Sequence, residues 1–95
     1  MAQPLVIIEH DPTAKLWYYL DWGSLGWLQD GETITGAEWT LDGVEKVDDR
    51  IDGDITYVQV TGGTPGIVLA TATCHVTTSA GNEDDRSIGL RIVDR

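Results

Sequence analysis

Turn signals cut this chain into short segments, and their spacing constrains the fold more than any other feature of the sequence. Eleven glycines and three prolines are spread along the 95 residues rather than gathered into a linker. The segments between them alternate apolar and polar residues, as half-buried strands do, and none has the period of about 3.6 residues that marks an amphipathic helix. We therefore predict an all-β fold, an antiparallel β-sandwich of about seven strands.

Strand alternation also predicts the core. Over Thr33–Leu41 it places Trp39 and Leu41 on one face, with Ile34 and Glu38 on the other. The same alternation in two later segments, 67–78 and 87–93, completes the predicted core: Trp39, Leu41, Ala72, Cys74, Val76, Leu90 and Ile92. A buried tryptophan followed by a cysteine on a later strand is typical of the immunoglobulin-like sandwich, although the second cysteine is missing here.

The first residues read differently from the rest. Pro4 and Pro12 each lack a backbone donor and favour extended geometry in the residue before them. Between them lie the strand-forming residues Leu5, Val6, Ile7 and Ile8. We expect residues 1–13 to form an extended arm and residues 14–95 to form the single sandwich domain. The alternative, that Leu5 to Ile8 is the first strand of the domain's own sandwich, stays open.

Charge and cysteine content exclude several classes of function. Sixteen Asp and Glu against six Lys and Arg give a net charge of −10, which repels nucleic-acid phosphates and anionic membranes. The single cysteine, Cys74, rules out an intramolecular disulfide. The longest apolar run, Leu5–Ile8, is far shorter than the roughly 18 residues of a membrane span. We expect no nucleic-acid partner, no membrane partner and synthesis in a cytosol.

One acidic stretch, Asp42 to Asp54, matches part of the pattern of a calcium-binding loop. A calcium loop that starts at Asp48 places Gly53 correctly at the sixth position. It then places Arg50 at a ligand position and Gln59 where a bidentate glutamate belongs, and the flanking segments read as strands. A solvated acidic hairpin is the favoured interpretation.

The sequence offers no catalytic constellation. Cys74 and His75 are neighbours on a predicted strand, so their side chains point to opposite faces and cannot share a hydrogen bond. His10 and His75 have no metal-ligating partner at a suitable spacing, and no serine lies in a nucleophile elbow. We predict no enzyme activity, no metal and no cofactor.

The aromatic residues leave two interpretations open. The chain has four tryptophans, Trp17, Trp22, Trp27 and Trp39. They could stack on sugar rings in a carbohydrate-binding groove, or they could all be buried in a small core or in a protein interface. The loop after the first aromatic segment is glycine-rich but carries bulky apolar side chains. We predict that Trp22, Leu25 and Trp27 in this loop contact a partner.

Several motifs, taken in order, resemble a known family. They are Asp11-Pro12 leading into Leu16 to Trp22, Trp27 to Ile34, Glu38-Trp39-Thr40, Val60 to Gly66, Cys74 to Gly81, Arg86-Ser87, and Leu90 to Val93. The sequence resembles small virion proteins of tailed bacteriophages that are described as fiber-tail adaptor or immunoglobulin-like tail proteins. The resemblance extends over nearly the whole chain.

The resemblance implies a non-enzymatic virion protein that joins fiber or other tail and head-tail proteins. Its partners would be other virion proteins, met in a symmetric assembly of several copies. Leu5, Val6, Ile7 and Ile8 would add a strand to a neighbour's sheet edge. Two alternatives remain, a capsid decoration protein and a carbohydrate-binding or adhesion module.

Overall fold

The fold is all-β, as predicted. The computed structural model describes residues 4–24, 26–66 and 69–94, and no helix occurs in these ranges. Seven strands make up most of them: β1 (Pro4–His10), β2 (Lys15–Asp21), β3 (Ile34–Asp42), β4 (Glu45–Asp52), β5 (Ile55–Thr61), β6 (Ala70–Thr78) and β7 (Glu83–Ile92). The turn between β4 and β5 consists of Gly53 and Asp54, with Gly53 at a φ of 60°. Glycine takes up this conformation without strain, and it suits a two-residue hairpin.

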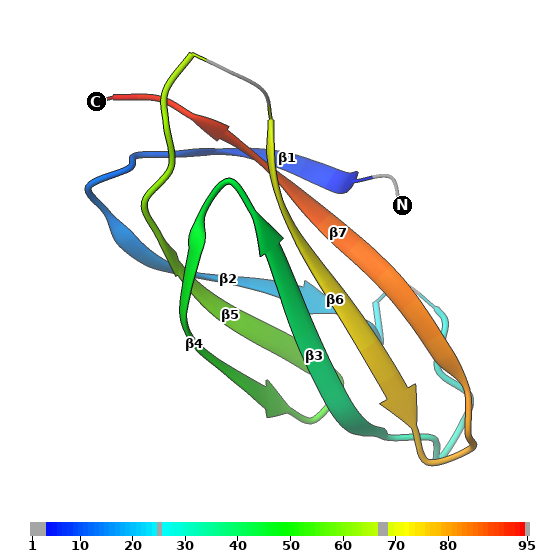
Figure 1. Cartoon of the computed structure of the whole chain (residues 1–95). Helices are drawn as coiled ribbons and strands as arrows, with labels where there is room; N and C mark the ends of the chain where they lie inside the picture. Colours follow the sequence, from blue (N-terminus) through cyan, green and yellow to red (C-terminus); the bar gives the residue numbers. More distant parts are fainter. Residues whose placement is uncertain (1–3, 25, 67–68, 95) are drawn as a thin grey trace.

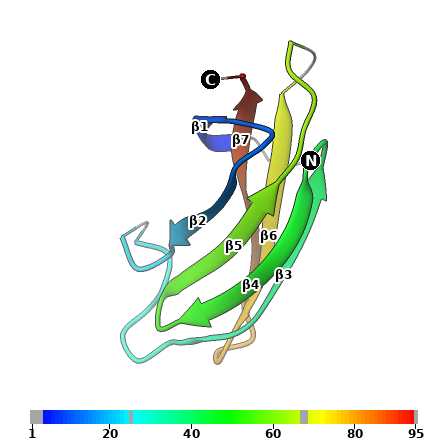
Figure 2. The ribbon, with the colours of Figure 1, turned by 90° about the vertical axis from the view of Figure 1, so that its left-hand side faces the viewer.

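The strands form two layers (Figures 1 and 2). The larger sheet has the order β1-β7-β6-β3 and the smaller one the order β2-β5-β4. With the strands lettered A to G in chain order, the larger sheet is A-G-F-C and the smaller one is B-E-D. These are the C-F-G and B-E-D groupings of the immunoglobulin fold, with strand A added to the C-F-G sheet, so the predicted immunoglobulin-like sandwich is confirmed. Four of the described strand pairs are antiparallel, but β1 runs parallel to β7, which makes the larger sheet mixed.

The segment expected as an arm contains β1. In its ladder with β7, Val6 lies opposite Ile88 and Ile8 lies opposite Leu90. His10, at the end of β1, is fully buried, and its Nδ1 lies 2.6 Å from the hydroxyl oxygen of Tyr18. The structure therefore shows the alternative that the sequence left open, in which this segment is a strand of the protein's own sandwich. β1 occupies the side of β7 that does not pair with β6, beside the buried residues Ile88 and Leu90.

The core lies between the two sheets and is narrow. β6 contributes small side chains, and Ala72, Cys74 and Val76 are all buried. Trp39 on β3 is buried directly opposite Cys74 in the β3–β6 ladder. Of the other residues predicted to be in the core, Leu90 and Ile92 are buried, and Leu41 is half-buried against the core cluster.

A β-bulge in β3 alters the predicted alternation. Ile34 lies opposite Thr78 and Gly36 lies opposite Thr77, so Thr35 is an extra residue in this strand. An extra residue shifts the side-chain period by one. Ile34 is therefore buried together with Trp39, although simple alternation places the two on opposite faces. The turn chemistry of the sequence gave no sign of this bulge.

A polar bridge crosses the core at Thr56 on β5. The Trp22 Nε1–H donates to Thr56 Oγ1 at 3.0 Å, and the Cys74 thiol donates to the same oxygen at 3.5 Å. All three residues are fully buried. Because Cys74 belongs to the larger sheet, this bridge joins the two layers through the core, as a disulfide does in antibody domains. Burial raises the pKa of Cys74 to about 11, so the thiol stays protonated and remains a donor.

Replacing Thr56 by valine should therefore destabilise the fold. Thr56→Val keeps the side-chain shape but leaves the buried Trp22 N–H without an acceptor, which costs about 1–3 kcal/mol. Denaturant unfolding followed by tryptophan fluorescence measures this loss. The matched control is Thr40→Val on the exposed face of β3, which should change the free energy of unfolding by less than about 0.5 kcal/mol. If the two variants lowered the free energy of unfolding equally, the hydrogen bonds of Thr56 would make no specific contribution to stability.

Candidate docking surfaces

The outer edge of β1 is the first candidate surface. β1 is an edge strand of the larger sheet, with β7 as its neighbour on one side. Val6 is 45% exposed and Ile7 is 51% exposed. Because neighbouring strand residues point to opposite faces, these apolar side chains flank the open backbone edge on both sides. Ile8 is half-buried against the core, and Leu5 lies in β1 by its backbone.

Two of the edge strands, β1 and β4, differ sharply in their number of charged side chains. β4, an edge of the smaller sheet, carries six charged side chains in eight residues: Glu45, Lys46, Asp48, Asp49, Arg50 and Asp52. β1 has Glu9 as its only Asp, Glu, Lys or Arg. Charged side chains are a common protection of edge strands against unwanted pairing. The edge of β4 is thus protected, whereas that of β1 suits the addition of a partner strand.

Aromatic side chains gather on the outer face of the smaller sheet. On β2, Trp17 is 41% exposed and Tyr19 is 60% exposed, and between them Tyr18 turns into the core. Tyr19 lies opposite Tyr57 of β5, and their ring centroids are 6.0 Å apart. Arg50 of β4 completes the set, with its Cζ 5.3 Å from the Trp17 ring centroid and 4.7 Å from that of Tyr57. We call Trp17, Tyr19, Tyr57 and Arg50 the aromatic face.

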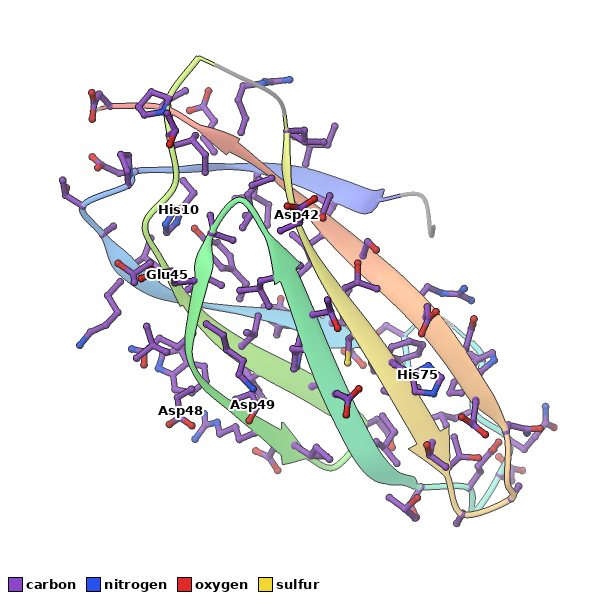
Figure 3. All side chains as sticks on the ribbon, viewed as in Figure 1. His10, Asp42, Glu45, Asp48, Asp49 and His75 are labelled. Carbon is purple, nitrogen blue, oxygen red and sulfur yellow. The ribbon has the colours of Figure 1, made fainter. Side chains whose placement is uncertain are left out.

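Carboxylates surround the aromatic face. The β4–β5 and β5–β2 ladders place Asp48 in line with Gln59 and Trp17, and Asp52 in line with Ile55 and Asp21. Directly opposed residues of an antiparallel pair share one face of the sheet. In Figure 3 the labelled acids Glu45 and Asp48 follow β4. The surface is therefore aromatic at its centre and acidic at its margin.

The loop after β2 differs from the prediction. Trp22, expected to contact a partner, is fully buried because the core surrounds its ring and Thr56 accepts its N–H. Trp27 is half-buried, and its ring centroid lies 5.1 Å from that of Trp22. Leu25 lies outside the described residues. Trp22 is thus a core residue, and the exposed aromatic surface lies on β2 and β5 instead.

Glu32 connects the end of this loop to Thr78 and Asn82 through hydrogen bonds. Glu32 as a residue is only 8% exposed. Its carboxylate accepts hydrogen bonds from the backbone N–H of Gln29 at 2.9 Å, from Asn82 Nδ2 at 3.0 Å and from the Thr78 hydroxyl. These bonds, the one from Gln29 first, lower the pKa of Glu32. The loop is thereby joined to the turn between β6 and β7.

Glu32→Gln should weaken this attachment in a pH-dependent way. A carboxyl group whose folded pKa is depressed stabilises the fold above its unfolded pKa, and this contribution disappears as the pH falls through the folded pKa. Thermal unfolding should show a lower Tm for Glu32→Gln than for the wild type at pH 7, with the gap closing at acidic pH. A gap that persists at acidic pH would assign the loss to altered packing rather than to charge.

The outer face of the larger sheet is polar and internally bonded. The two ring nitrogens of His75 on β6 (Figure 3) lie within hydrogen-bonding distance of carboxylate oxygens on β7. Nδ1 is 2.6 Å from Asp85 Oδ1, and Nε2 is 2.8 Å from Glu83 Oε1. The two carboxylates, Glu83 first, raise the pKa of His75. Cys74 points the other way into the core, as strand geometry requires.

Within residues 4–24, 26–66 and 69–94, no group of three or more His, Cys, Asp or Glu side chains is placed to hold a metal ion. In the same part of the chain there is no helix with the length and apolar character needed to cross a membrane.

The fold and its surfaces define a small immunoglobulin-like module with two exposed areas suited to protein contacts. Residues 10–91 match the model of a family described as podophage GP4 fiber-tail adaptor protein gp77. The match contains β2 to β6 and nearly all of β7, and the chain belongs to this family. It is a structural protein of a tailed phage and a component of the virion. No curated protein matches the chain.

Proposed function

We propose that this protein is a non-enzymatic adaptor that joins a fiber component to the tail of the particle, in several symmetry-related copies. The family description supports the role. The observation that carries it is the open edge of β1, where exposed Val6 and Ile7 flank backbone groups that a partner strand can pair with. The partner's strand would extend the larger sheet by β-augmentation.

Pairing through an edge strand suits an adaptor for physical reasons. Backbone hydrogen bonds supply affinity, and the side chains on both faces supply specificity. Repetition of the contact around a symmetric tail adds avidity without any new contact. The net charge of −10 keeps free copies apart before assembly.

The test places a charge on the edge of β1 without removing the strand. Ile7→Lys should reduce the number of copies in purified particles by about tenfold or more, because an added lysine blunts edge pairing. Mass spectrometry of separated heads, tails and fibers measures the copies. The matched control is Thr40→Lys, which adds the same charge to the exposed side of β3, the opposite edge of the same sheet.

The distribution of the wild-type chain separates the remaining functions. Recovery with tails or fibers, in a multiple of about three or six copies set by ring symmetry, fits the adaptor. Recovery with heads in hundreds of copies would make the protein a capsid decoration protein. Normal incorporation of Ile7→Lys would exclude β1 as the docking edge.

A further inference from the structure

We propose that the aromatic face, formed by Trp17, Tyr19, Tyr57 and Arg50, binds a second virion protein through a segment in which an apolar residue is flanked by lysines or arginines. The inference rests on the proposed adaptor function and adds a second binding surface, for the second of the two components that an adaptor joins. β1 would hold one partner, and the aromatic face would hold the other.

The residue types are the first argument. Tryptophan, tyrosine and arginine are the residues that most often dominate the binding energy of protein interfaces. Here they lie side by side on β2, β5 and β4, with Trp17 and Tyr19 among the large apolar side chains left exposed. The fold does not need them on this face, because Tyr18 and Leu20 already fill the inner side of β2.

The face is also ordered before any partner arrives. The β2–β5 ladder is regular along its whole length, from Lys15 opposite Thr61 to Asp21 opposite Ile55. The Arg50 guanidinium stacks on two rings at once, which holds both the cation and the rings in place. Pre-ordered side chains lose less entropy on binding, so more of the contact energy appears as affinity.

Charge complementarity identifies the partner. Four carboxylates, Asp21, Glu45, Asp48 and Asp52, share the outer face of the smaller sheet with the aromatic side chains. Among the described residues on that face, the opposing cations are Lys15 and Arg50. An apolar residue on the rings would be surrounded by carboxylates, so basic neighbours in the partner's segment would be attracted and acidic ones repelled.

The position of Arg50 favours a protein over a glycan. A sugar ring binds aromatic side chains by stacking on their open faces, but the guanidinium already lies over Trp17 and Tyr57. Of the other tryptophans, Trp22 and Trp39 are buried and Trp27 is half-buried. Trp17 is thus the exposed tryptophan of the set, and no row of open indole rings is left for an oligosaccharide.

The two docking surfaces lie on different sheets. β1 is an edge of the larger sheet, and the aromatic face is the outer side of the smaller one. A strand added beside β1 extends the larger sheet sideways and leaves the outer side of the smaller sheet uncovered (Figure 2). Two partners can therefore be bound at the same time, as a joint between two components requires.

Photo-crosslinking in intact particles tests the proposal. Tyr19→benzoylphenylalanine keeps an aromatic side chain at an exposed site and captures whatever lies on it. The same residue at Ile7 reports on the β1 edge, and at Thr40 it serves as the control on the outer face of the larger sheet. After irradiation, mass spectrometry identifies the attached peptides. We expect Tyr19 to capture a protein segment that contains lysines or arginines around an apolar residue, and to capture a protein different from that at Ile7.

A charge reversal gives an independent measurement. Asp48→Lys combined with Asp52→Lys should lower the yield of the Tyr19 crosslink by about tenfold or more, since repulsion replaces attraction. Glu38→Lys combined with Asp42→Lys makes the same change of charge on exposed positions of β3 and should leave the yield unchanged.

The outcomes separate this inference from the proposed function. Crosslinks from Ile7 with none from Tyr19 would overturn the inference and leave the adaptor role in place. A Tyr19 crosslink to an acidic segment, or to carbohydrate alone, would overturn it as well. Absence of crosslinks at both positions, in particles that contain the chain, would count against both.

Discussion

The architecture depends on one contact between the two sheets, the buried hydroxyl of Thr56. Small side chains on β6 allow the layers to lie close together. Thr56 accepts hydrogen bonds from Trp22, the residue after β2, and from Cys74 on β6. This fixes where β2 and β5 lie over the larger sheet. The exposed rings on the outer side of β2 and β5 are therefore held in a fixed position as well. A docking face on so small a domain needs this kind of support, because its core is thin.

Much of the fold could be predicted because its signals are local. Turn residues and alternation give the strands, and the inward positions of Ala72, Cys74, Val76 and Leu90 follow from the period of two. The parallel β1–β7 pair and the bulge at Thr35 could not be predicted, since both depend on which strands meet in space. β1 read as a free arm for the same reason. The residues Leu5 to Ile8 do not indicate which strand they pair with.

The candidate surfaces show the same limit. Val6 and Ile7 could be picked from the sequence because an apolar run near a proline stands out. Trp22 was misplaced because a glycine-rich loop suggests exposure, whereas its indole finds an acceptor on a strand 34 residues away. The aromatic face was missed as a set, because it joins residues of three strands that only the ladder register brings together. Alternation in β2 gives the outward side of Trp17 and Tyr19 but not their neighbours.

The parallel pairing of β1 with β7 has a mechanical consequence. The first described residues enter β1 at the end where Pro4 faces Ser87, and the chain leaves β7 at the other end, near Ile92 (Figure 1). A force that separates the two ends of the chain would act along both strands in opposite directions. The rungs of this ladder would then be loaded together in shear rather than opened one after another like a zipper. A tensile load on the module would thus be shared along the whole length of the β1–β7 contact.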